Sequence, residues 1–202
     1  MAATLAKQQA NRWPALLEAA ATLFAERGYR ATTIRDVAQV AGVTPGALYF
    51  HVPAKQALLV AVYTEGVDRI VRHVDTLVDQ EAEPALRFRR AIKAHLESIL
   101  DASAFARVIV RVVPDDVPEA AAELRAQRDR YETRFRALIA ALDVPPERSR
   151  TLLRMLLLGA LNSTPIWYRR SSGSMDAIVD EFVAVFGIGP ANAKSGRRSD
   201  ES

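Results

Sequence analysis

The chain has 202 residues, of which half are hydrophobic and a quarter are charged, and it contains no cysteine. It is therefore one large or two small domains with enough apolar residues for a core, and a disulfide framework, a cysteine metal site and a cysteine nucleophile are excluded. The net charge is +3, and the six basic and three acidic side chains of residues 1–60 account for the whole excess. An excess placed in this way suits a polyanionic partner.

The ends and apolar runs of the chain favour a cytoplasmic location. Residues 1–10 lack a basic start followed by an apolar core, as a secretory signal would have. The longest apolar runs, such as Val108 to Val113, are short and interrupted by arginine, so we predict no membrane partner. The absence of cysteine fits a reducing compartment. Residues 1–11 are predicted to form a loose arm.

Two helices are predicted between residues 12 and 42. The first spans residues 12–27 and ends at Gly28. The second begins at Thr33, which forms a capping-box pattern with Asp36, and ends at Gly42, where a left-handed turn is easiest for glycine. Its apolar positions recur at helical spacing, at Ile34, Val37, Ala38 and Ala41. This spacing predicts one buried face.

A third short helix begins at Thr44 and Pro45, a favourable N-cap followed by a proline at the first helical position. Together with the preceding helix it predicts a helix-turn-helix over residues 33–52. The first turn of this helix is small and polar, which suits close approach to base edges in a major groove. Val43 and Leu48 are expected to anchor it inward. Donors follow at its C-terminal end, at Tyr49, His51 and Lys55, where they suit DNA phosphates.

The N-terminal segment resembles the DNA-binding domain of the TetR family of bacterial transcriptional regulators. The matching runs are Ala19 to Tyr29, Thr32 to Ala38, Ala41 to His51, and Lys55. The resemblance implies phosphate contacts from Thr33, Tyr49, His51 and Lys55. It implies that Thr44, Pro45, Gly46, Ala47 and Phe50 lie at or near the groove. The sequence departs from the family pattern at Val52, Ala54 and Gln56.

The remainder of the chain also predicts helices, and no period-two alternation is long enough for a strand. The expected helices cover residues 54–81, one beginning at Pro84, and residues 104–113, 118–142, 147–168 and 175–186. The fold class is therefore all-α, with about nine helices. We predict a helix-turn-helix domain over residues 1–53, an effector-binding and dimerisation domain over residues 54–189, and a disordered tail over residues 190–202. The helix over residues 54–81 is the natural lever between the two domains.

The helices over residues 147–168 and 175–186 carry more apolar surface than one bundle face needs. Two such helices from each subunit predict an isologous four-helix homodimer, which is also how TetR-family proteins dimerise. A dimer places two recognition helices about 34 Å apart, one turn of DNA. The expected partner is therefore a palindromic operator in double-stranded DNA.

The C-terminal half resembles the ligand domain of TetR-type regulators that respond to acyl-CoA thioesters. The similar stretches are Arg107 to Pro114, Leu124 to Arg136, and Leu158 to Arg169. An acyl-CoA site needs an apolar pocket and cations for the phosphates. Arg107 and Arg111 share a helix face and are candidates for the phosphates, although a solvated face paired with Asp115 or Asp116 is an open alternative. The other candidate ligand residues are Tyr131, Phe135, Leu157, Leu161, Asn162 and Trp167.

The function predicted from these features is a repressor that an effector releases from its operator. An alternative is a TetR-type regulator that senses an amphipathic drug or a small lactone, for which Glu97 and Asp101 are the obvious acids. An enzyme is disfavoured, because the three histidines are far apart and no nucleophile motif or metal-spaced cluster is present. We therefore predict no catalytic residue, metal ligand or cofactor. A purely architectural DNA-binding protein would not need the large apolar second half.

Overall fold

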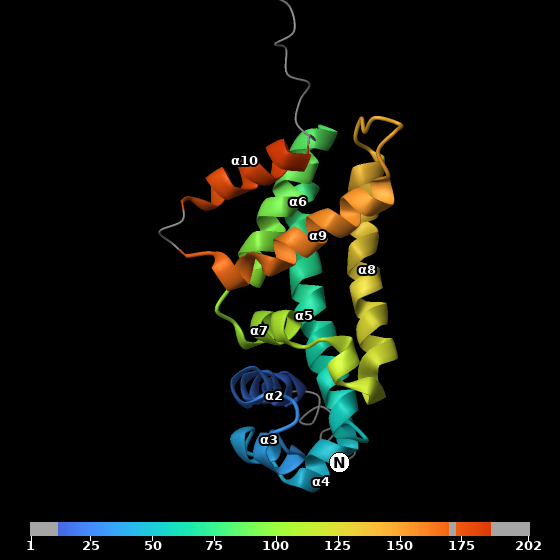
Figure 1. Ribbon diagram of the computed structural model, residues 1–202. Coiled ribbons are helices and arrows are strands. Elements are labelled where there is room, and N and C mark those ends of the chain that lie inside the picture. The colour runs from blue at the N-terminus through green and yellow to red at the C-terminus, as the bar shows by residue number, and fades with distance from the viewer. Residues whose placement is uncertain (1–11, 170–172, 187–202) are drawn as a thin grey trace, which may run out of the picture. The chain divides into compact units, whose positions relative to one another are not determined.

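The structure is a computed structural model that describes residues 12–169 and 173–186 (Figure 1). These residues form nine α-helices and two 3-10 turns without a strand, which confirms the all-α prediction. The elements in chain order are α2 (Trp13–Arg27), α3 (Ile34–Val40), α4 (Pro45–His51), α5 (Lys55–Val78), α6 (Pro84–Ile99), α7 (Ala104–Arg111), η1 (Pro114–Asp116), η2 (Pro118–Ala120), α8 (Ala121–Ala140), α9 (Arg150–Trp167) and α10 (Met175–Phe186).

The described chain divides into two compact units. The first holds the residues up to His73 together with Glu97–Thr133, and the second holds Val74–Leu96 and the residues from Arg134 onward. The first unit takes in more than the predicted domain of residues 1–53, because α7 packs against α2. The predicted functional division at residues 53 and 54 stays a prediction. The predicted arm over residues 1–11 and tail over residues 190–202 lie outside the described residues.

The helix-turn-helix forms in the first unit through the local signals expected of it. The Thr33 hydroxyl accepts a hydrogen bond from the Asp36 N–H, and the Asp36 carboxylate accepts one from the Thr33 N–H at 2.8 Å. These contacts from Thr33 hold the pKa of the Asp36 carboxyl below its usual value. Gly42, at φ 65°, makes the turn, and the Thr44 hydroxyl caps α4 by accepting from the Ala47 N–H.

Packing of α3 and α4 follows the predicted apolar face. Ile34, Val37 and Ala38 of α3 and Leu48 of α4 are all buried. Helix α3 packs against both α2 and α4. Buried apolar side chains on one face of each short helix therefore fix the orientation of α4 within the unit, since burial of a Leu side chain stabilises by about 2 kcal/mol.

Further contacts in the first unit join α5 to α7 and α8. A Cβ atom added at Gly66 of α5 would lie 3.0 Å from a side-chain carbon of Ile109, so the glycine permits the close approach of α7. The Arg128 guanidinium of α8 donates to the Tyr63 hydroxyl at 2.8 Å and to the Val112 carbonyl oxygen at 3.0 Å. This contact holds α8 against α5 and the end of α7.

Arginine and lysine side chains join the helices of the second unit through ion pairs and hydrogen bonds. On α6, Arg89 pairs with Asp180 at 2.8 Å and Lys93 pairs with Asp176 at 2.8 Å, so α10 is held to α6. The Arg150 guanidinium donates to the Ile139 carbonyl oxygen at 2.6 Å and so satisfies the C-terminal end of α8.

Four predicted helices were too long at their ends. The helix predicted over residues 54–81 spans Lys55–Val78. The helix predicted over residues 104–113 ends at Arg111, because Val113 precedes Pro114 and adopts an extended backbone. The helix predicted over residues 118–142 spans residues 121–140, since Pro118 begins a 3-10 turn. The helix predicted over residues 147–168 begins at Arg150, because Ser149 is its N-cap. Helix α10 has the predicted limits, Met175–Phe186.

Candidate functional site

Helix α4 presents an open, largely apolar face. Thr44, Pro45 and Gly46 are exposed at its start. The side chains of Tyr49 and Phe50 are 53% and 74% exposed. The preceding residue, Leu48, is fully buried. Ala47 is half-buried. Helix α4 is therefore anchored mainly by Leu48 and leaves its exposed residues available to a partner.

His51 and Thr33 flank this face. The His51 ring stacks on the Trp13 ring of α2, with 5.5 Å between centroids, and it also meets the edge of Phe50. This stacking holds the half-buried imidazole at the end of α4. Thr33 is exposed at the start of α3, with its hydroxyl donating to Asp36 at 2.7 Å. Both residues lie on the same three-helix part of the first unit as α4.

Lys55 has several partners inside the first unit. Its ammonium donates to the backbone carbonyl oxygens of Tyr29 at 3.0 Å, Thr32 at 3.1 Å and Arg30 at 3.5 Å. It also lies 4.3 Å from the centre of the Tyr29 ring. An ammonium has three N–H donors, and these three carbonyls engage them. These contacts tie the start of α5 to the segment between α2 and α3, and the phosphate contact expected of Lys55 stays a prediction.

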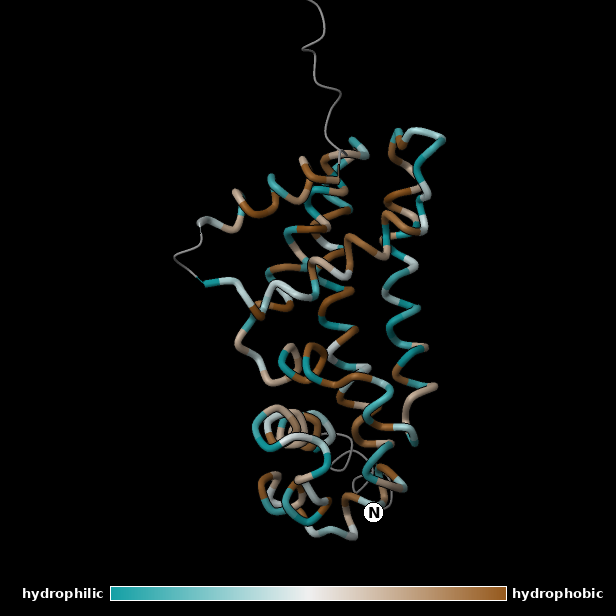
Figure 2. Tube along the Cα trace, in the orientation of Figure 1, coloured by the Kyte–Doolittle hydropathy of each residue, from teal (hydrophilic) through white to brown (hydrophobic). Residues whose placement is uncertain are grey.

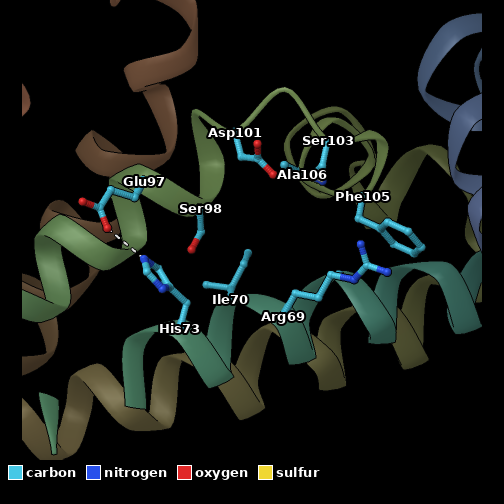
Figure 3. A pocket seen from close by; sticks show the side chains of 10 residues that line it. Arg69, Ile70, His73, Glu97, Ser98, Asp101, Ser103, Phe105 and Ala106 are labelled. Atoms are coloured by element: carbon cyan, nitrogen blue, oxygen red, sulfur yellow. Dashed lines mark hydrogen bonds and ion pairs between the residues drawn. The ribbon is translucent and has the colours of Figure 1, made fainter. Parts of the chain in front are cut away.

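A pocket of about 280 Å³ lies in the first unit beside α5 (Figure 3). Residues 66, 69, 70 and 73 of α5 recur at helical spacing and line one side of it. The opposite side comes from the end of α6, from the link to α7 and from α7 itself. The lining residues are Gly66, Arg69, Ile70, His73, Glu97, Ser98, Asp101, Ser103, Phe105 and Ala106. The pocket therefore combines an apolar floor with several polar groups.

The charges of the pocket are mainly acidic. The Arg69 guanidinium stacks on the Phe105 ring at 3.9 Å and pairs with both Glu65 and Glu18, at 2.9 and 2.8 Å, so its charge is already compensated. His73 Nε2 lies 2.8 Å from a Glu97 carboxylate oxygen (Figure 3). Asp101 adds an exposed carboxylate at the rim. Glu18 belongs to α2, so Arg69 links the pocket wall directly to the helix-turn-helix part of this unit.

The predicted ligand residues fall in both compact units. Arg107, Arg111 and Tyr131 belong to the first, and Phe135, Leu157, Leu161, Asn162 and Trp167 belong to the second. Tyr131 is 9% exposed, while Phe135, Leu157 and Leu161 are fully buried. Trp167 is 47% exposed on the last turn of α9. These apolar side chains are thus mostly core residues of their own units.

Of the two arginines predicted to hold phosphates, Arg111 is engaged within the first unit, where it donates to the Ala25 carbonyl oxygen of α2 at 2.5 Å. The Nε atom of Arg107 is buried and has no hydrogen-bond partner among the described residues. The alternative prediction paired these arginines with Asp115 or Asp116. Asp115 pairs instead with Arg125 of α8. The Arg111 contact directs the side chain to the end of α2, which favours a structural role; phosphate binding by either arginine stays a prediction.

Asn162 contacts a histidine in the second unit. It is exposed on α9 and forms a hydrogen bond with His95 of α6, which is 2% exposed and meets the edge of the Phe135 ring. Burial lowers the pKa of His95 to about 4, and the bond with Asn162 opposes this only in part. His95 is therefore a neutral core histidine at neutral pH, as its apolar surroundings on α6 lead us to expect.

Sequence reasoning missed the pocket residues Arg69, His73 and Phe105. The helical spacing of Arg69 and His73 on α5 was visible in the sequence, but Phe105 belongs to α7 and the other facing residues also come from elements about 30 residues further along the chain. Among the described residues, no helix is long and apolar enough to cross a bilayer. In the same part of the chain, no group of three His, Asp or Glu side chains is placed to hold a metal ion.

These observations define a helix-turn-helix regulatory protein with a further helical region. Residues 16–62 match the family model for bacterial regulatory proteins of the tetR family, and residues 81–187 match the tetracyclin repressor-like C-terminal domain. The chain belongs to the TetR family, which confirms the resemblance found in the sequence and makes it a regulator rather than an enzyme.

Known relatives agree with this assignment. The chain is 38% identical over 95 residues to the HTH-type transcriptional repressor KstR2 of Mycobacterium tuberculosis, covering 47% of this chain and 48% of that protein. It thus spans about half the length of the curated relatives it matches first. Among solved structures, FadR of Bacillus halodurans, a fatty acid degradation regulator, superposes with a TM-score of 0.75 at 17% identity over 90% of this chain and 96% of FadR.

A second solved structure is AibR in complex with isovaleryl coenzyme A and operator DNA. It superposes with a TM-score of 0.70 at 22% identity, covering 88% of this chain and 97% of AibR. At these identities, the two structural matches support the fold alone.

Proposed function

We propose that the chain is a ligand-controlled transcriptional repressor that binds a palindromic operator as a homodimer. The observation that carries this proposal is the open face of α4, which leaves Thr44, Pro45, Gly46, Tyr49 and Phe50 exposed and offers small side chains at its first turn. Family membership and the similarity to the transcriptional repressor KstR2 support it. Such a protein acts where the DNA lies, in the cytoplasm.

On the DNA, α4 enters the major groove and its neighbours contact the backbone. Thr44, Pro45, Gly46, Ala47 and Phe50 meet the groove, and Thr33, Tyr49 and His51 contact phosphates. Lys55 is left out of this set because its donors already bind three carbonyl oxygens.

Dimerisation is proposed through α9 and α10 of the second unit. Along α9 the side chains of Leu152, Met155 and Leu156 are 59%, 58% and 66% exposed, and Val185 of α10 is 74% exposed. Figure 2 shows the hydrophobic residues along these two helices. A groove of about 490 Å³ lined by α9 and α10 residues runs through this patch. A second copy covers such a surface best, because an exposed apolar patch of this extent marks an interface.

The effector of first choice is an acyl-CoA thioester. AibR, of the same fold, binds isovaleryl coenzyme A, and the sequence resemblance in the C-terminal half points the same way. Tyr131, Phe135, Leu157, Leu161, Asn162 and Trp167 are the residues proposed for the acyl part, and Arg107 and Arg111 for the phosphates.

A second effector class is favoured by the pocket beside α5. Its carboxylates are Glu97, which lies 2.8 Å from His73 Nε2, and the exposed Asp101, whereas its one arginine, Arg69, is paired with both Glu18 and Glu65. Such a pocket attracts an amphipathic amine and repels the phosphates of coenzyme A. A drug-like amine bound there would act on α5, which Arg69 joins to Glu18 of α2.

In either case the effector favours a state in which the two recognition helices no longer fit the operator. The shift in operator affinity is limited by the difference in effector affinity between the two states. A hundredfold release therefore requires about 2.7 kcal/mol of differential binding.

Fluorescence anisotropy on the DNA beside its own gene tests the proposal, with a panel of acyl-CoA thioesters and a panel of amphipathic amines. Release by one thioester supports the first effector class, and release by an amine supports the second. In the second case Glu97→Gln should lose the response, whereas Glu123→Gln, an exposed acid on α8, should keep it. Binding to no DNA would refute the repressor, and binding that no compound alters would refute both effector classes.

A further inference from the structure

The chemistry of the exposed face of α4 is unusually restricted for a helix proposed to read DNA. From Thr44 to His51 the chain contains no Arg, Lys, Asn or Gln. The exposed positions are Thr44, Pro45, Gly46, Tyr49 and Phe50. His51, the one basic side chain, is half-buried and stacked on Trp13. The face that would meet base edges therefore lacks the long polar side chains that usually read them.

Each base presents different groups in the major groove. Guanine is read mainly by Arg or Lys at its O6 and N7 atoms, and adenine by Asn or Gln at N6 and N7. Thymine alone adds a methyl group, which is recognised by apolar contact. An exposed face that carries Pro45 and Phe50 matches the thymine methyl and leaves the polar edges of the other bases without a bidentate partner.

Phe50 has the exposure that such a contact requires. Its side chain is 74% exposed, more than any other large apolar residue of the helix-turn-helix. The fold leaves this apolar side chain in water, so it contributes no burial energy to the stability of the free protein. A contact with a flat apolar group of the partner would remove this surface from water and stabilise the complex.

Gly46 gives a second, independent indication of close approach on the same face. A Cβ atom added there would meet only the Thr44 hydroxyl oxygen, at 4.0 Å, so packing within the protein does not require a glycine. Glycine inside a helix is less stable than alanine by about 1 kcal/mol. The missing side chain therefore leaves the backbone open to something outside the chain, at the start of the helix that carries Phe50.

We propose that α4 reads its operator through thymine 5-methyl groups, with Phe50 as the specificity-determining side chain and Gly46 admitting the DNA to close contact. This inference rests on the DNA-binding function proposed above. Thr33, Tyr49 and His51, which contact phosphates in the function proposed above, position the helix on the backbone, so they contribute affinity rather than base choice. The half-sites should accordingly carry thymines at the positions that α4 faces.

The test begins with duplexes selected by the full chain from a random-sequence library. Each thymine of the selected half-site is then replaced by uracil, which removes only the 5-methyl group. We expect the Kd to rise about fourfold for each methyl that α4 contacts, which is the worth of one buried methyl group. Substitution of thymines outside the half-sites should leave the Kd unchanged.

Protein variants assign the methyl contact to a side chain. Phe50→Ala should weaken binding to the thymine duplex about tenfold and bring the uracil-to-thymine ratio of Kd values to about one. Leu86→Ala, which removes a 44% exposed side chain from α6, should keep the ratio of the unsubstituted protein. Gly46→Ala should raise the unfolding temperature or leave it unchanged while it abolishes binding. Thermal unfolding of each variant shows whether the fold is intact.

The outcomes separate this inference from the function beneath it. If no duplex is selected, the proposed DNA-binding function fails, and the inference fails with it. If a duplex binds tightly but uracil and thymine versions bind equally, or if Phe50→Ala keeps their ratio, DNA binding stands and the thymine readout is overturned. The thymine readout is established if Phe50→Ala is folded and binds the uracil and thymine duplexes equally, while Leu86→Ala keeps the difference in Kd.

Discussion

Lys55 and Tyr29 are joined twice in the first unit. The Lys55 ammonium donates a 3.0 Å hydrogen bond to the Tyr29 carbonyl oxygen and lies 4.3 Å from the centre of the Tyr29 ring. The Tyr29 hydroxyl in turn donates to Glu119 at 3.0 Å, and burial together with this carboxylate raises the pKa of Tyr29 to about 12. The segment after α2 is thus bound from one side by α5 and from the other by the turn at η2.

Replacement of Lys55 by methionine should lower the free energy of unfolding by about 1–3 kcal/mol, because carbonyl oxygens in a partly buried setting lose a charged donor. Urea unfolding followed by circular dichroism measures this loss. Arg35→Met, an exposed change on α3, should have little effect on stability.

The same variant distinguishes the internal role of Lys55 from a phosphate contact. Loss of a phosphate contact reduces the slope of log K against log salt by about one. We expect the slope of Lys55→Met to match that of the unsubstituted protein on the selected operator. A slope reduced by one would show that Lys55 also reaches the backbone of the DNA.

Gly66→Ala should lower the unfolding temperature, because the added Cβ would lie 3.0 Å from Ile109 on α7. The expected loss is about 1–3 kcal/mol, the usual result of overpacking. Shortening the neighbour, in Gly66→Ala with Ile109→Ala, should recover part of the loss relative to the sum of the two single changes. Strict additivity in differential scanning calorimetry would argue against the contact.

Stability should fall as the pH is lowered from about 6.5 to about 4, through His95. Its pKa is lowered from 6.5 to about 4 in the folded state, so the unfolded state binds the extra proton in this window. Full protonation corresponds to about 3 kcal/mol. His95→Gln should flatten the dependence of the unfolding free energy on pH in this window. Equal slopes in the variant and the unsubstituted protein would contradict the assignment.

Leu156→Glu should dissociate the proposed dimer, since it places a charge in the middle of the exposed apolar face of α9. An interface anchor is worth 2 kcal/mol or more, so the dimer Kd should rise at least about thirtyfold. Light scattering after size-exclusion chromatography measures the mass. Leu86→Glu, at a 44% exposed position of α6, is the matched control and should stay dimeric. A monomeric unsubstituted protein at micromolar concentration would refute the interface.

Much of this protein was determined by the sequence alone, wherever the interactions are local. Capping of α3 by Thr33 and Asp36, the turn at Gly42 and the start of α4 at Thr44 each depend on groups within three or four residues. Helical periodicity likewise identified the all-α class and the buried anchor Leu48. These signals are readable because hydrogen bonds and backbone preferences within one turn do not depend on the rest of the fold.

Only the tertiary structure decided where the charged side chains go. Lys55 meets carbonyl oxygens 23 to 26 residues earlier in the chain, and Arg111 meets the carbonyl of Ala25. Arg69 meets Glu18 and Phe105 on two other helices and so forms a pocket wall that no local pattern contains. A long flexible side chain reaches several angstroms in many directions, so its partner is set by which helices pack together, whereas its position in the sequence fixes only the helix face it starts from.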